Sequence, residues 1–263
     1  MNIGTDFYFD GKRLSSFGLI ICSIDDSADG NFSVGSVTEL NTSKPPRSSR
    51  WNYLGESYSE PLSFEIQIAK LRNAVCCGIT QDEERAILKW LKQIMPYKEF
   101  YFIPPDPVED IIYHKAKITD MESIKYGGKI IGYFLTIETN APFGYSKEKS
   151  VSISANSQIT LNVDSDEKDY IHPRIEIKAT ESGTVTVQNL SNDSSSSVSN
   201  LAADETVTID KTGFGIYSDL STHNAIDDFS KTWFKLEDGE NIIKVDGAAD
   251  VTLYYREPRK VGG

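Results

Sequence analysis

The residues IGYFLTIETNAPFGYS (131–146) close the first half of the chain and decide its fold. Ile111–Glu122 predicts one strand, Tyr126-Gly127-Gly128 a turn, and Lys129–Thr139 a long returning strand. Glycine reaches the positive φ of a hairpin turn at little cost. Apolar side chains recur at every second position of the returning strand, so one face covers a core. Because Pro142 has no N–H to add to a ladder, the sheet ends here, and we expect a domain boundary close behind, after residue 147.

Composition indicates a globular protein of two domains, residues 1–147 and 148–263. Hydrophobic residues make up 39% of the chain and charged residues 25%. No apolar run approaches the roughly eighteen residues of a membrane span, and the N-terminus lacks the pattern of a signal peptide. Three cysteines, two of them adjacent at Cys76-Cys77, form neither a disulfide framework nor a zinc motif. We expect them to be small hydrophobic residues.

The charge is acidic and unevenly spread. The formal net charge is −12, of which −3 falls in residues 1–147 and −9 in residues 148–263. Nucleic-acid binding requires a basic surface, so the acidic second half argues against that function.

The first half combines antiparallel strands with one helix. Asp10-Gly11 predicts a turn within the hairpin of residues 7–14, and the alternating run Leu62–Ala69 predicts a strand with one wet face. Thr80 and Glu83 fit a capping box, from which we expect a helix with an apolar stripe reaching Ile94, stopped by Pro96. Further strands are expected at residues 19–24, 34–40 and 98–103. The first domain is therefore predicted to be of the α+β class and mainly antiparallel.

A polar, basic, proline-containing segment at residues 41–50 leads to the aromatic run of residues 51–58. A surface loop is one interpretation. The other is a protein–protein contact, because interface cores are enriched in Trp, Tyr and Arg. The interface candidates are Arg47, Arg50, Trp51 and Tyr53.

The second half predicts an all-β sandwich. Short strands are separated by turn clusters, at residues 151–153, 158–163, 174–179, 184–188, 206–209, 215–217, 233–236, 241–245 and 251–255. The polar run Asn189–Ser199 is expected to be a mobile, solvated loop. Tyr217 and Trp233 are candidates for stacking on sugar rings, although both residues are equally suited to a core.

No catalytic, cofactor-binding or metal-binding pattern is present. His114, His172 and His223 are each isolated in sequence, and no nucleophile or phosphate-loop motif occurs. The acidic pair Asp227-Asp228 is expected on the surface, and the acidic run 25–31 lacks the spacing of a calcium loop, so we expect an Asx-rich turn there. The chain is thus predicted not to be an enzyme.

Three stretches, in order, carry a family resemblance. They are the opening FYFDGKRLSSFGL (7–19), the PFGYS segment (142–146), and the ending WFKLEDGENII (233–243) followed by VTLYYR (251–256). Together they resemble the distal tail protein (Dit) family of long-tailed siphophages. The resemblance implies a β-sandwich or split barrel with one helix in the N-terminal domain, and a galectin-like or carbohydrate-module-like sandwich in the C-terminal domain.

The resemblance also implies a structural role at the tip, or baseplate, of a phage or prophage tail. The N-terminal domain would form a hexameric ring, closed in part by a belt-like extension near Trp51. Implied partners are the tail tube protein, the tail tip or tail-associated protein, and a receptor-binding or fibre protein, with assembly in the bacterial cytoplasm. The alternative is a carbohydrate-binding sandwich that recognises host glycans.

Overall fold

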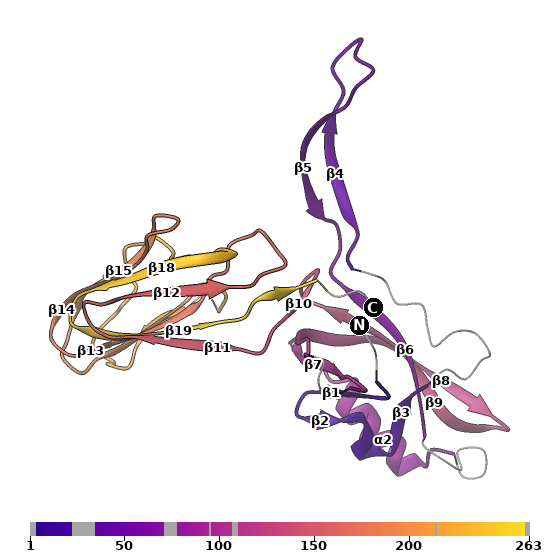
Figure 1. The fold of residues 1–263 in the computed structure, drawn as a ribbon. Coiled ribbons are helices and arrows are strands. Elements are labelled where there is room, and N and C mark those ends of the chain that lie inside the picture. Colours follow the sequence, from indigo (N-terminus) through magenta and orange to yellow (C-terminus); the bar gives the residue numbers. More distant parts are fainter. Residues whose placement is uncertain are drawn as a thin grey trace. The chain divides into compact units, whose positions relative to one another are not determined.

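The computed structural model describes residues 4–22, 35–70, 78–94, 96–106, 110–213 and 215–260. It divides into two compact units (Figure 1). The first comprises the described residues up to Tyr145 together with Lys260, and the second comprises Ser146–Arg259. Antiparallel sheets dominate both, which confirms the predicted mainly-β class.

The first unit is built on a seven-stranded antiparallel sheet in the order β2-β1-β7-β8-β9-β6-β3. Its strands are β1 (Asp6–Phe9), β2 (Lys12–Arg13), β3 (Leu19–Ile21), β6 (Ser63–Lys70), β7 (Lys98–Ile103), β8 (His114–Tyr126) and β9 (Lys129–Thr139). A 3-10 helix, η1 (Leu14–Phe17), joins β2 to β3, and a short strand, β10 (Gly144–Tyr145), ends the unit. Two further strands, β4 (Thr38–Ser43) and β5 (Asn52–Tyr58), pair only with each other among the described strands.

The central hairpin forms as its sequence predicts. Gly127 and Gly128 have φ values of 56° and 79°, which the turn between β8 and β9 requires. Tyr133, Leu135 and Ile137 are buried on one face of β9, whereas Phe134 on the other face is 41% exposed. The alternation therefore faces a core as expected, although β8 begins at His114 rather than at Ile111.

The helix α2 (Gln81–Leu91) packs its apolar side against this core (Figure 1). Thr80 Oγ1 accepts from the N–H of Glu83, and the Glu83 carboxylate accepts from the N–H of Thr80, so the capping box is confirmed. The stripe does not extend to Ile94, which is fully exposed. The helix ends at Leu91, with Lys92 as its C-cap residue, several residues before Pro96.

The second unit is a sandwich of two antiparallel sheets around one hydrophobic core. The five-stranded sheet has the order β11-β19-β13-β16-β17 and the four-stranded sheet the order β12-β18-β14-β15. The strands are β11 (Lys149–Ile153), β12 (Gln158–Val163), β13 (Arg174–Ala179), β14 (Gly183–Asn189), β15 (Ser194–Leu201), β16 (Thr206–Asp210), β17 (Gly215–Ser218), β18 (Gly239–Asp246) and β19 (Ala249–Tyr255), with a short β20 (Pro258–Arg259) at the end. Eight of the nine predicted strands are found here.

Two expectations for this unit are wrong. The serine-rich run 189–199 is not a solvated loop, because most of it belongs to β14 and β15, and Ser196 and Val198 are fully buried. The Ser196 hydroxyl donates to the carbonyl of Thr232 and accepts from the N–H of Phe234. Residues 233–236 are not a strand, since their contact with β15 passes through serine hydroxyls and only Leu236 forms a β-bridge, to Ile171.

Other boundaries move by a few residues. The strand expected at 34–40 is β4 at 38–43, and the strand expected at 19–24 is β3, which ends at Ile21. The acidic run 25–31 and the pair Cys76-Cys77 lie outside the described residues. Across the described residues, no helix is long and apolar enough to cross a membrane.

Candidate interaction surface

The hairpin β4–β5 is highly exposed. All six residues of β4 are exposed, and of the seven residues of β5 only Gly55 and Tyr58 are partly covered. Figure 1 shows the pair extending away from the seven-stranded sheet. A two-stranded hairpin of this kind is at best marginally stable in water unless one face is covered.

The register gives the hairpin an apolar face. Leu40 and Thr42 lie on the same face of β4, and Thr42 pairs with Tyr53, so Tyr53 shares that face. One step beyond the strands, Lys44 is opposite Trp51, and its Nζ lies 5.5 Å from the centre of the Trp51 ring. Leu40, Tyr53 and Trp51 therefore lie along one face, and each is more than 60% exposed. Glu56, which pairs with Leu40, lies on the same face.

The opposite face of the hairpin is polar. A β-bulge opposite Asn41 and Thr42 leaves Leu54 without a pairing partner in the register, and Leu54 is 62% exposed. The remaining side chains are those of Glu39, Asn41, Ser43, Asn52 and Ser57. Leu40, Tyr53 and Trp51 are thus concentrated on one face of the hairpin, which also carries Glu56, and the side chains of the other face are mostly polar.

The tip of the hairpin is a compact basic turn. The Ser48 N–H donates to the Pro45 carbonyl at 3.1 Å, and the Ser48 hydroxyl accepts from the Arg50 N–H at 3.0 Å. Arg47 has a φ of 64°, a left-handed conformation that costs a residue with a Cβ roughly 1 kcal/mol. Three basic residues and no acidic residue lie between positions 44 and 51 of a chain whose net charge is −12.

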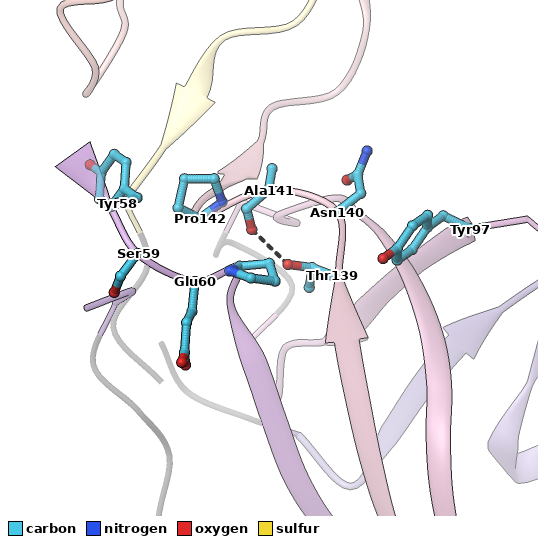
Figure 2. A pocket seen from close by; sticks show the side chains of 9 residues that line it. Tyr58, Ser59, Glu60, Tyr97, Thr139, Asn140, Ala141 and Pro142 are labelled. Carbon is cyan, nitrogen blue, oxygen red and sulfur yellow. Dashed lines mark hydrogen bonds between the residues drawn. The ribbon is translucent and has the colours of Figure 1, made fainter. Parts of the chain in front are cut away.

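The base of the hairpin is tied to the segment after β9. The Ser36 hydroxyl donates to the Pro142 carbonyl at 2.9 Å, and the rings of Tyr58 and Phe143 meet edge to face at 6.2 Å. A shallow hollow of about 320 Å³ opens there (Figure 2). Figure 2 shows Tyr58 and Tyr97 at opposite ends of it, and the other lining residues are Ser59, Glu60, Pro61, Thr139, Asn140, Ala141 and Pro142. These groups anchor the hairpin and form no recognisable catalytic set.

The structure thus brings the four predicted interface residues, Arg47, Arg50, Trp51 and Tyr53, onto one hairpin, and all four are exposed. Their role in an interface stays a prediction. Sequence reasoning missed Leu40 and Leu54, which join the aromatics only through strand pairing. The sequence does not reveal that pairing, because both strands are short and a bulge at Leu54 shifts the register.

The two proposed sugar-stacking residues are not brought together. Tyr217 is 56% exposed on β17, an edge strand of the five-stranded sheet. Trp233 lies beside β15 of the other sheet, half-buried, with its ring 5.1 Å from that of Phe229. Glycan binding by either residue stays a prediction.

The histidines are less isolated than the sequence indicates. Each ring nitrogen of His223 lies against a carboxylate, Nδ1 against Glu205 and Nε2 against Asp228 at 2.9 Å. His172 Nδ1 lies 3.3 Å from the carbonyl of Phe234, and its Nε2 lies 2.7 Å from Lys211 Nζ. These contacts occupy the nitrogens that a catalytic base or a metal ligand would need.

His114 has a different environment, within the core of the first unit. It is 2% exposed, its ring lies 5.3 Å from that of Phe64, and neither ring nitrogen has a hydrogen-bond partner. Burial lowers the pKa of His114 to about 4, so the ring is neutral at pH 7. Within the described residues, no group of three or more His, Cys, Asp or Glu side chains could hold a metal ion.

Comparison with known proteins identifies both halves of the sequence. Residues 2–141 match the family described as the phage tail protein N-terminal domain, and residues 143–255 match the family described as the phage tail C-terminal domain. No curated protein sequence matches the chain.

Solved structures share the fold. The Dit protein of phage SPP1, described as a paradigm of the hub adsorption apparatus in phages infecting Gram-positive bacteria, is 11% identical over 95% of this chain and 98% of its own, with a TM-score of 0.67. A chain of the phage P2 baseplate in its activated conformation with calcium is 6% identical over 97% of this chain and 99% of its own, with a TM-score of 0.60. A chain of the phage p2 baseplate in its activated conformation with strontium is 8% identical over 95% of this chain and 97% of its own, with a TM-score of 0.51. At these identities the similarity establishes the fold alone.

Proposed function

This chain belongs to the family of phage tail proteins, and from that premise we propose that it is a distal tail protein that forms a hexameric ring at the tail tip. The ring joins the tail tube to the tip or tail-associated protein. The C-terminal unit holds receptor-binding or fibre proteins. The role is structural rather than catalytic, and assembly takes place in the cytoplasm of the bacterial host.

The hairpin β4–β5 is the observation that carries this proposal. Its apolar face, with Leu40, Trp51 and Tyr53, is in water in a single subunit. Packing that face against a neighbouring subunit would remove it from water and stabilise a hairpin that is marginal alone. Aromatic residues at the centre of such a contact are the usual sites of highest binding energy.

Charge supports a second copy of the chain as the partner of the hairpin. The basic tip, with Lys44, Arg47 and Arg50, projects from a protein whose remaining residues carry a net charge more negative than −12. A neighbouring copy therefore presents an acidic surface on average, which favours approach of the tip. One head-to-tail contact, repeated with a rotation that closes, gives a ring.

The solution mass of the purified protein, measured by light scattering over a concentration series, tests the proposal. We expect a hexamer or a double ring. The variant Tyr53→Ala is expected to weaken each contact by about 2 kcal/mol, roughly thirtyfold in dissociation constant. Tyr126→Ala is the matched control, because Tyr126 is 63% exposed against 61% for Tyr53 and lies in the β8–β9 turn.

If Tyr53→Ala and Tyr126→Ala give oligomers of equal stability, the hairpin is not part of the interface. A strict monomer that also fails to bind the tail tube protein and the tip protein in pull-down experiments would refute the distal tail role itself.

A further inference from the structure

One segment of the second unit covers the open edge of a sheet. Strand β15 is the last strand of the four-stranded sheet, and residues Asp219–Ser230, here called the cover segment, reach its outer edge. The N–H of Ser199 donates to the carbonyl of Asp228 at 3.0 Å, and the N–H of Ser230 donates to the carbonyl of Ser197 at 2.9 Å. The N–H of Ser197 donates to the Ser230 hydroxyl at 3.0 Å. The cover segment thus satisfies backbone groups that an edge strand leaves unpaired.

Few apolar contacts hold the cover segment. Its buried apolar side chains are those of Ala225 and Phe229, whereas Leu220 and Ile226 are 38% and 52% exposed. Phe229 and Ala225 belong to the core of the sandwich, so opening the segment exposes that ring as well as breaking its polar contacts. The polar contacts set the part of this cost that can change with pH.

His223 makes the central polar contact. Its Nδ1 meets the carboxylate of Glu205, a fully buried side chain in the turn before β16, and its Nε2 meets the carboxylate of Asp228 at 2.9 Å. Ionised carboxylates only accept hydrogen bonds. Both contacts are hydrogen bonds only when both ring nitrogens carry a proton, that is, when the imidazole is the imidazolium cation.

We propose that His223 is a proton-operated latch, which holds the cover segment on the edge of β15 when protonated and releases it when it loses its proton. In the neutral ring one nitrogen presents a lone pair to a carboxylate, so one of the two contacts turns repulsive. Either the bond that ties His223 to Glu205, outside the cover segment, or the bond within the segment to Asp228 is then lost, and in the second case Asp228 keeps its bonds from Ser199 and Asn200.

The charged groups around His223 favour its protonated form. The carboxylates facing the ring are those of Glu205 and Asp228, and the hydrogen bond to Glu205, followed by that to Asp228, raises the pKa of His223 despite burial. Asp219 accepts from the N–H of Thr206, and Asp227 accepts from the Asn224 amide, so the other acids of the segment are engaged. The side chains of Ser218, Ser199 and Asn200, which also bond these carboxylates, are uncharged.

The pKa of the two carboxyls shifts the opposite way, as an ion pair requires. Burial raises the pKa of Glu205, but hydrogen bonds from Ser218, the Ala202 N–H and His223 outweigh it and lower that pKa. Hydrogen bonds from Asn200 and His223 lower the pKa of Asp228. The latch is therefore closed below the ordinary histidine pKa of about 6.5 and opens as the pH rises through the raised value.

Two linked measurements on the unmodified protein test the latch. An NMR titration of the His223 ring gives its pKa in the closed state. Hydrogen exchange at the Ser197 and Ser199 amides, expressed as protection factors from about pH 5.5 to about pH 9.5, gives the opening equilibrium. For each unit by which the pKa of His223 in the closed state exceeds its ordinary value, the protection factors of the two amides are expected to fall about tenfold from the low-pH to the high-pH end of the titration. The amide of Ile177, in the centre of the five-stranded sheet, is expected to keep a constant protection factor.

Two variants imitate the neutral and the protonated state of His223. His223→Gln, which carries no charge, is expected to show the low protection of the high-pH state at every pH. His223→Arg keeps a charge and can donate to both carboxylates, so it is expected to stay protected across the range. An ordinary or lowered pKa of His223, or protection at Ser197 and Ser199 that does not change with pH in the unmodified protein, would overturn the proposal whether or not the variants fold.

Discussion

Acid is expected to destabilise the N-terminal unit through one side chain, His114. Its ring is buried against Phe64 and Phe100, and both nitrogens lack partners. The folded state therefore resists protonation, with a pKa of about 4, whereas the unfolded chain takes up a proton near pH 6.5. Because the unfolded state binds the proton more tightly, the free energy of unfolding falls as the pH drops from about 6.5 to about 4.

The expected loss follows from the shift. A difference of about 2.5 units at 1.36 kcal/mol per unit gives roughly 3 kcal/mol, reached at pH 4 and absent at pH 7. That amount is a large part of the stability of a typical domain. Carboxylates that are paired in the folded state add their own acid dependence, so a variant is needed to isolate the histidine.

The assay is urea unfolding of the natural protein and of His114→Leu at pH 7, 6, 5 and 4. Replacing Trp51 and Trp233 by Phe in both proteins leaves the buried Trp90 as the fluorescence reporter of the N-terminal unit. We expect the leucine variant to be at least as stable at pH 7, because no hydrogen bond is lost, and to gain about 3 kcal/mol over the natural protein by pH 4.

A stability difference between the two proteins that stays constant from pH 7 to pH 4 would refute this reasoning. It would mean that the His114 ring is solvated or bonded rather than buried without a partner. His172→Gln serves as a control, since His172 belongs to the other unit and its replacement is expected to leave the Trp90 transition unchanged at every pH.

Three more changes have definite expected effects on stability. Trp90→Phe removes the hydrogen bond that Nε1 donates to a main-chain carbonyl at 2.8 Å and leaves a gap, so urea unfolding followed by circular dichroism should lose about 2 kcal/mol. Glu257→Gln weakens charge-assisted bonds of 2.7 Å from Lys149 and 2.9 Å from Arg259 to a buried carboxylate, so thermal unfolding of the C-terminal unit should show a loss of about 2 kcal/mol; an unchanged Tm would contradict this. Ser196→Ala leaves two main-chain groups unbonded and should cost about 2 kcal/mol, and a cost below about 0.5 kcal/mol would show that the hydroxyl bonds are replaced by others.

Much of the fold could be predicted from local patterns. The capping box at Thr80, the glycine turn at Gly127-Gly128 and the alternation of β6 and β9 depend on residues within four positions of one another, so the printed sequence contains the whole cause. The interface candidates were found in the same way, because aromatic and basic residues are clustered within residues 47–53.

The pairing of distant segments could not be predicted in this way. The amphipathic face of the hairpin depends on the bulge that places Tyr53 opposite Thr42, and the bulge has no sequence signal of its own. The buried state of His114 depends on rings supplied by β6 and β7, whose positions relative to β8 only the sheet order reveals.

The sequence by itself determined the mainly-β class, the strands with a regular alternation, the capped helix and the acidic character, since each follows from neighbouring residues or from composition. Only the tertiary structure decided that a serine-rich run becomes the buried edge strand β15, and that His223 lies between Glu205 and Asp228. The reason is physical: whether a polar side chain is buried depends on the groups that other parts of the chain place around it. Ser196 and His223 receive hydrogen-bond partners there, whereas His114 is enclosed by aromatic rings without one.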